Sequence, residues 1–275
     1  MNKDSLNKIL DTIIVIFLSV YIFFPILVAF AFAFATKWFP SHWWFPQEFG
    51  VKWFEELLKS APVINSLVLS YMIAFFVTLF TLTISLLAGY VLGTKAFRES
   101  FKSTRLIENL SNIPLAFPAI TLGIGLLPVY ARLGLLGTIP GVIFAHMVMA
   151  VPYALRSVIG AFLSVPEDYE EAARNLGAGR LYILLRIYLP LVWPGILAGA
   201  IFSFTWSLNE FVLTLFLGYP KIETLPVQIY QLVGGYYLHP QMAAALSLFL
   251  LVPSIILLYL IEKASKFGST MAMGG

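Results

Sequence analysis

The chain has 275 residues, of which 60% are hydrophobic and 11% are charged, and its formal net charge is +3. Soluble globular proteins carry about a quarter charged residues, so this composition excludes a protein that faces water over its whole surface. It predicts an integral membrane protein. The chain has no cysteine, which excludes disulfides and thiolate metal sites.

The first apolar run covers residues 13–34 and follows Lys3 and Lys8. It is long enough to cross the hydrocarbon core, which takes about 20 residues. A cleaved signal peptide is the alternative, but the run exceeds the usual length of about 7–15 residues and no clean small-residue cleavage site follows it. We therefore expect a retained span that starts in the cytoplasm.

The segment from residue 37 to residue 61 is rich in aromatic side chains, including Trp38, Trp44 and Trp53. Tryptophans at the end of a span favour the headgroup level, so we expect this segment to lie along the outer surface. Two interpretations stay open for it. It is either a docking surface for a solute-binding protein or a simple aromatic belt.

The second apolar run, residues 67–92, is followed by a short basic loop. The basic residues of this loop are Lys95, Arg98, Lys102 and Arg105. Because Lys and Arg are enriched in cytoplasmic loops, the second span is predicted to return to the cytoplasm. Gly89 and Gly93 have a spacing of small residues that lets two helices approach closely in lipid.

The third and fourth apolar runs, residues 110–130 and 139–155, are interrupted by prolines. These are Pro114, Pro118, Pro128, Pro140 and Pro152. Proline removes a backbone donor, so we expect kinked or broken helices near a pathway rather than facing lipid. His146 lies in the fourth run. A ligand or proton site is one interpretation, and a neutral histidine hydrogen-bonded inside the bundle is the favoured one.

The long polar stretch of the chain covers residues 164–190. Ser164 is followed three residues later by Glu167, which is the spacing of a capping box, so a short helix is predicted to begin near Val165. Ala173 and Gly177 are four residues apart and are predicted to share a face that a partner can approach closely. Gly177 or Gly179 is predicted to end this helix in a left-handed conformation.

The same stretch carries a longer pattern. Glu171-Ala172-Ala173 is followed after three residues by Gly177, after nine more by Ile187, and then by Leu189-Pro190. This pattern resembles the EAA loop that marks the membrane permease subunits of binding-protein-dependent ABC importers. The resemblance implies that Glu171, Ala172, Ala173 and Gly177 couple the chain to a separate ATPase subunit. An ordinary amphipathic cytoplasmic loop is the alternative.

Two further runs, residues 191–217 and 243–261, complete a prediction of about six spans in an all-α polytopic protein with both termini in the cytoplasm. Residues 220–240 between them are too polar to cross, and residues 225–232 are predicted to form a short helix at the outer mouth. All of the 17 Lys and Arg residues fall on the predicted cytoplasmic side except Lys37, Lys52, Lys59, Arg132 and Lys221. This bias supports the predicted orientation.

Glu210 lies well inside an apolar run. A carboxylate at that depth is costly unless it faces a cavity or a partner, so a functional site is the first hypothesis. Trp206, Asn209 and Glu210 are spaced to share roughly one helical face, which predicts a substrate pathway along it. A structural hydrogen bond to a neighbouring helix is the alternative.

The absence of catalytic and nucleotide-binding motifs distinguishes a transport subunit from an enzyme. The chain has no His-Glu-x-x-His, no Gly-x-Ser-x-Gly and no phosphate-binding Gly-Lys-Ser/Thr, so we expect a transport subunit without metal or cofactor rather than an enzyme, with ATP handled by another chain. A membrane receptor or structural scaffold is the alternative class.

The resemblance covers nearly the whole chain and implies a single permease domain, residues 1–275, with the type I importer fold. It also implies ATPase subunits, a solute-binding protein, and a second permease that is a related chain or a copy of this one; no nucleic acid is expected as a partner. Residues 51–57, 203–211 and 223–230 look most like the spermidine/putrescine branch. We therefore expect a polyamine or similar small cation as the solute, with a sugar or another small solute as the alternative.

Overall fold

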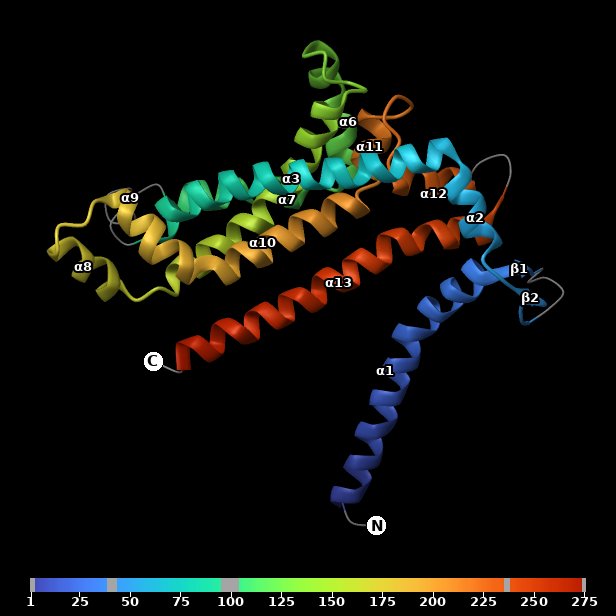
Figure 1. Cartoon of the computed structure of the whole chain (residues 1–275), viewed down its shortest axis with the longest axis horizontal. Coiled ribbons are helices and arrows are strands. Elements are labelled where there is room, and N and C mark those ends of the chain that lie inside the picture. The colour runs from blue at the N-terminus through green and yellow to red at the C-terminus, as the bar shows by residue number, and fades with distance from the viewer. Residues whose placement is uncertain (1–2, 39–43, 95–103, 235–237, 274–275) are drawn as a thin grey trace. The chain divides into compact units, whose positions relative to one another are not determined.

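The computed structural model describes residues 3–38, 44–94, 104–234 and 238–273 (Figure 1). Within this part of the chain, long helices dominate and a short two-stranded ribbon is the β structure, as predicted for an all-α membrane protein. Contacts divide the chain into two compact units. One unit contains Met1–Ile64 and Gln228–Leu251, and the other contains Asn65–Val227 and Val252–Gly275.

The first unit begins with helix α1, Lys3–Phe34, whose large apolar side chains are exposed all around the helix. A helix that is apolar on every side fits a lipid environment. Strand β1, Ala35–Lys37, pairs antiparallel with β2, Glu48–Phe49, and helix α2, Lys52–Lys59, follows. The indole Nε1 of Trp53 donates to the carbonyl of Ala35 at 2.7 Å, which holds α2 against the ribbon.

Two tryptophans of this region, Trp38 and Trp44, differ in their exposure. Trp38 packs its ring on Phe32 with 4.3 Å between the ring centroids, so it contributes to the packing of its own unit. Trp44 is 94% exposed. The interpretations of this segment as a belt or as a docking surface both remain predictions.

The second unit is built around helix α7, Ile139–Leu163, which packs against α3, Ala61–Gly93, and α10, Leu189–Asn209. A Cβ atom added to Gly93 would lie 2.4 Å from the Cβ of Phe162, and one added to Gly195 would lie 2.4 Å from the Cβ of Ala161. The backbones of these helices therefore approach too closely for larger residues, and the close approach expected from the glycine spacing in α3 is confirmed.

The segment that contains the expected third span, residues 110–130, is broken into three pieces, as its prolines predict. They are α5, Thr104–Ser111, the 3-10 turn η1, Ile113–Ala116, and α6, Ala119–Arg132. Pro114 lies at the start of η1 and Pro118 is the N-cap of α6, so the prolines set the breaks because they cannot donate a backbone hydrogen bond. With 14 residues, α6 is too short to cross the membrane alone.

The prediction of about six spans agrees with this arrangement, in which the segment of the third expected span is the interrupted one. Within the described residues, five helical stretches are long and apolar enough to cross: Leu10–Phe34, Ala61–Gly93, Ile139–Leu163, Arg180–Asn209 and Pro240–Leu257. The fourth expected span extends beyond residue 155, since α7 accommodates Pro152 and continues to Leu163.

The fifth expected span also differs from the prediction. It begins earlier, in α9, Arg180–Ile183, and continues through the π-helix η2, Leu184–Tyr188, into α10. It is not continuous to residue 217, because α10 ends at Asn209 and a separate helix α11 covers Val212–Leu217. Figure 1 shows α8 and α9 near one end of α10 and α11 near the other.

Two helices complete the chain. The short helix expected at residues 225–232 is confirmed as α12, Leu225–Gly234. The last helix, α13, covers Pro240–Met273.

Candidate functional site

The polar loop after α7 contains helix α8, Glu167–Asn175. The predicted capping box is wrong, because Ser164 is the C-cap of α7 and its hydroxyl donates to the carbonyl of Ala161 at 2.8 Å. The N-cap of α8 is Pro166, which makes no side-chain cap. Acidic residues still occupy the first turn of α8, where they favour the positive end of the helix dipole.

Gly177 ends the helix, as one of the two predicted alternatives. Its φ of +81° is left-handed, and its N–H donates to the carbonyl of Arg174 at 2.9 Å. The N–H of Ala178 donates to the carbonyl of Ala173 at 3.0 Å. These two bonds form a Schellman motif, which turns the chain sharply and requires a residue that tolerates positive φ.

The four residues of the EAA-like pattern do not all lie on one exposed face of α8. Glu171, Ala172 and Gly177 are exposed, but Ala173 is buried. Ala173 belongs to a cluster with Phe162 of α7 and with residues of α9, η2 and α10. The expectation that Ala173 offers its small side chain to a partner was wrong: it faces the core of its own unit, where it anchors α8.

Leu176 is 89% exposed at the tip of the loop, between the end of α8 and the Gly177 turn. Its apolar side chain is therefore open to contact with another molecule. The sequence alone does not distinguish this residue, because a leucine among apolar runs carries no special signal.

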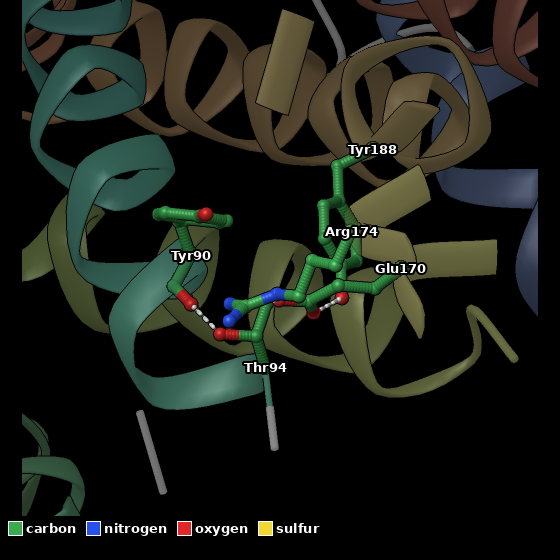
Figure 2. Close-up of polar contacts among 5 residues, drawn as sticks. All are labelled: Tyr90, Thr94, Glu170, Arg174 and Tyr188. Atoms are coloured by element: carbon green, nitrogen blue, oxygen red, sulfur yellow. Dashed lines mark hydrogen bonds and ion pairs between the residues drawn. The ribbon is translucent and has the colours of Figure 1, made fainter. Parts of the chain in front are cut away.

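Glu170, next to the motif, was also missed. Its carboxylate is buried and accepts hydrogen bonds from Arg174 Nε at 2.9 Å and from the Tyr188 hydroxyl at 2.5 Å (Figure 2). The spacing of Glu170 and Arg174, four residues apart on a helix, was the signal in the sequence for the first contact. Nothing in the sequence indicated the contact with Tyr188.

Tyr188 reaches Glu170 from the π-helix η2. Leu189 donates its N–H to the carbonyl of Leu184, five residues back, just before Pro190. Pro190 has no N–H to bond to the preceding turn, so the helix is irregular here, and such π-turns recur at functional sites. The Tyr188 ring lies 5.7 Å from that of Tyr90 and 5.3 Å from that of Phe162.

The three predicted substrate-pathway residues also separate. The side chain of Asn209 is exposed and bonds back to the carbonyl of Thr205 at 2.8 Å, whereas Glu210 is buried. Oε1 of Glu210 accepts the N–H of Leu213 at 2.8 Å. Because α10 ends before Glu210, Trp206, Asn209 and Glu210 do not share a helical face, and the carboxylate caps the start of α11.

Trp206 lies between two core clusters of its unit. Its indole Nε1 is buried and has no hydrogen-bond partner among the described residues. Its ring stacks on that of Phe202, with 6.1 Å between the centroids. The structure therefore places this predicted pathway residue inside the packing of the helices.

His146 is fully buried and bonded through both ring nitrogens. Nδ1 lies 2.9 Å from the Ser207 hydroxyl of α10, and Nε2 lies 2.8 Å from the Thr214 hydroxyl of α11. This agrees with the favoured interpretation of a hydrogen-bonded histidine inside the bundle. Across the described residues, no three His, Asp or Glu side chains are grouped so that they could hold a metal ion.

Comparison with protein families identifies one model that matches. It is described as the inner membrane component of binding-protein-dependent transport systems, and it matches residues 85–267. The matched region includes the loop with α8, the π-helix and the break between α10 and α11.

Similar proteins of known name come from several transport systems. The chain is 27% identical to the spermidine/putrescine permease PotC of Escherichia coli K12, over 78% of each chain. It is 31% identical to the sulfoquinovosyl glycerol permease SmoH of Agrobacterium fabrum, over 82% of this chain and 79% of the other. It is 33% identical to the molybdate/tungstate permease WtpB of Pyrococcus abyssi, over 54% and 60%.

Solved structures share the fold. A chain of a bacterial ABC transporter that imports alginate superposes with a TM-score of 0.76 at 17% identity, over 96% of this chain and 98% of that one. A chain of the MetNI methionine ABC transporter superposes with a TM-score of 0.60 at 19% identity, over 76% and 99%. The architecture of the present chain is therefore that of type I ABC importer permeases.

Proposed function

The chain belongs to the family of inner membrane components of binding-protein-dependent transport systems, and we propose that within such a system α8 and its turn bind an ATPase subunit and couple it to solute movement. Family membership makes the chain a multi-pass permease subunit, in agreement with the prediction of a transport subunit rather than an enzyme. The coupling roles of Glu171, Ala172, Ala173 and Gly177 are part of this proposal.

The observation that carries the proposal is the division of the loop into an exposed and a buried face. Glu171, Ala172 and Leu176 are exposed, while Ala173 packs into the helical core. A partner can therefore contact the outer face while the inner face transmits force to the spans. This division also refines the prediction, because Ala173 acts on the inside and Leu176 supplies an apolar contact on the outside.

We propose an assembly of this chain with ATPase subunits, a second permease and an extracytoplasmic binding protein, with no nucleic acid. The solved alginate transporter in complex with its periplasmic protein is a precedent for the binding protein. The second permease is either a related chain or a copy of this one. A single permease domain over residues 1–275 stays a prediction.

The solute pathway is proposed to pass the break between α10 and α11, near Trp206, Asn209 and Glu210. Irregular backbone at membrane depth is tolerated where protein buries it or where it lines a watery cavity, and discontinuous helices build the binding sites of many transporters. Glu210 enters this proposal as the residue that shapes the break, since its carboxylate caps α11.

A polyamine or similar small cation is the solute that we propose first, and its support is the likeness to PotC. A sugar-like solute is the alternative, supported by the likeness to SmoH at 31% identity. The carboxylate of Glu210 adds no preference for a cation, because it is engaged with the backbone of α11.

The coupling proposal is tested on the assembled complex. Leu176→Asp places a charge where an apolar contact is proposed, and Leu133→Asp makes the same change at a residue that is 65% exposed far from α8. We expect Leu176→Asp to reduce recovery of the ATPase subunit with the purified permease and Leu133→Asp to leave it unchanged. Equal recovery in both variants contradicts the proposal.

Mass spectrometry of the solute that copurifies with the binding protein decides between the solute classes.

A further inference from the structure

Glu170 is the one acid at the start of α8 that the structure buries. It is 8% exposed, whereas Glu167, Asp168 and Glu171 around it are exposed. A buried carboxylate loses its hydration, so it is tolerated only where hydrogen bonds or opposite charges replace the water. Its partners therefore indicate what holds α8 in place.

The two oxygens of Glu170 have different partners. Oε1 accepts from Arg174 of the same helix, while Oε2 accepts from the hydroxyl of Tyr188 (Figure 2). The first contact orients the carboxylate within α8. The second contact leaves α8 and ends on η2, the last turn before α10.

Tyr188 also contacts the other long helices of its unit. Its ring packs against Tyr90 of α3 and Phe162 of α7. On the α3 side, the Thr94 hydroxyl bonds back to the carbonyl of Tyr90 at 2.7 Å, at the end of the helix (Figure 2). The Tyr188 side chain therefore links the Glu170 carboxylate of α8 to the ends of α3, α7 and α10.

We propose that Glu170 and Tyr188 are positioning residues that fasten α8 to α10, so that a movement of α8 imposed by the ATPase is passed to the spans. This inference rests on the proposed coupling function of α8. Neither residue needs to touch the ATPase. The Tyr188 hydroxyl carries the contact, because it is the donor that lies on the span and points at the carboxylate of the loop.

The test removes that hydroxyl and keeps the ring. Tyr188→Phe is compared with Tyr182→Phe, a change of the same size at a residue of α9 that is 60% exposed. Each variant is purified as the full complex with its ATPase and binding protein and reconstituted in liposomes. Uptake of labelled spermidine and hydrolysis of ATP are then measured together.

We expect Tyr188→Phe to keep ATPase subunits bound and to hydrolyse ATP while its uptake per ATP falls about 5- to 150-fold, the usual range of a coupling free energy. Tyr182→Phe is expected to match the unmodified chain. Unchanged uptake per ATP in Tyr188→Phe overturns the inference. A complex of the unmodified chain that recovers no ATPase subunit instead overturns the proposed function.

A second measurement does not depend on the solute. The chain has no cysteine, so Asn175→Cys on α8 and Leu191→Cys on α10 can carry a pair of spin labels without background. In the complex with the Tyr188 hydroxyl present, the distance between the labels is expected to stay constant when ATP and vanadate are added. With Tyr188→Phe it is expected to shift, and a constant distance in both overturns the inference.

Glu170→Gln covers the case in which Tyr188→Phe does not assemble. The amide keeps one oxygen that can accept from the Tyr188 hydroxyl, while its NH2 group replaces the oxygen that Arg174 contacts and the charge is lost. Retained uptake per ATP in this variant supports the role of the hydroxyl contact. Loss of uptake per ATP despite the retained acceptor overturns it.

Discussion

At the turn after α8, the backbone of Gly177 rather than a side chain is the determining feature. With φ at +81° and no atom within 4 Å of an added Cβ, the cost of substitution here is conformational and not steric. Gly177→Ala is expected to destabilise the turn by about 1–2 kcal/mol, the cost of a left-handed conformation for an L-residue. Limited proteolysis of the purified chain measures this destabilisation, and the loop of Gly177→Ala is expected to be cleaved faster than that of the unmodified chain.

Gly179 provides the matched control for that substitution. It also has open space around an added Cβ, but its φ is −74°. Gly179→Ala is therefore expected to leave proteolysis of the loop unchanged. Equal sensitivity of the two variants would mean that the left-handed turn does not limit the stability of the loop.

The carboxylate of Glu210 is predicted to act through its hydrogen bond to the start of α11. Glu210→Gln keeps an oxygen that accepts the Leu213 N–H, so transport and protein level are expected to persist. Glu210→Ala leaves that backbone donor unsatisfied at a cost of about 1–3 kcal/mol and is expected to lower the yield of folded protein. Loss of transport in Glu210→Gln at a normal protein level would instead show that the charge itself is required.

Between elements, the crossing of α3 and α7 is predicted to be intolerant of added volume. Gly93→Ala would place a Cβ 2.4 Å from that of Phe162, whereas Gly160→Ala in α7 meets nothing within 4 Å. We expect Gly93→Ala to cost about 1–3 kcal/mol, as for overpacked cores, and Gly160→Ala to be neutral or stabilising. Thermal unfolding of the two detergent-purified variants compares them, and equal melting temperatures would contradict the close crossing.

The elements differ in how far the sequence predicted them. The existence of α3, the start of α7 and the short α12 followed from hydropathy, and the breaks around α6 followed from Pro114 and Pro118. The break at Glu210 did not, because an uninterrupted apolar run with one acid looks the same whether the acid faces a pathway or caps a new helix. Likewise, the contact of Glu170 with Tyr188 depends on the path of the chain between α8 and α10, which no local pattern encodes.

For the whole molecule, the number of crossings decides on which side α8 lies. With α1 leaving the cytoplasm and α3 returning, α8 can face the cytoplasm only if the broken segment α5–η1–α6 crosses before α7 returns. The bias of Lys and Arg supports this orientation. The five long helices alone would place the loop on the outside.

Single cysteines test this topology because the chain has none. Leu133→Cys, just after α6 and 65% exposed, is expected to react with a membrane-impermeant maleimide added to intact cells. Asn175→Cys is expected to react only after the membrane is opened. The reverse pattern would place α8 outside and exclude contact with a cytoplasmic ATPase.

The close crossing of α3 and α7 also has a mechanical consequence. Gly89 and Gly93, which face Val158 and Phe162 of α7 at close range, lie on either side of Tyr90, which packs on Tyr188. The close approach of α3 to α7 therefore lies at the same turn as the contact of α3 with Tyr188, and α3 extends from there to Asn65 over about 40 Å at 1.5 Å per residue. On an arm of that length, a tilt of about 5° displaces the far end by about 3–4 Å. A small rotation of α3 at the end near Tyr188 would therefore become a larger displacement at the opposite end of the helix.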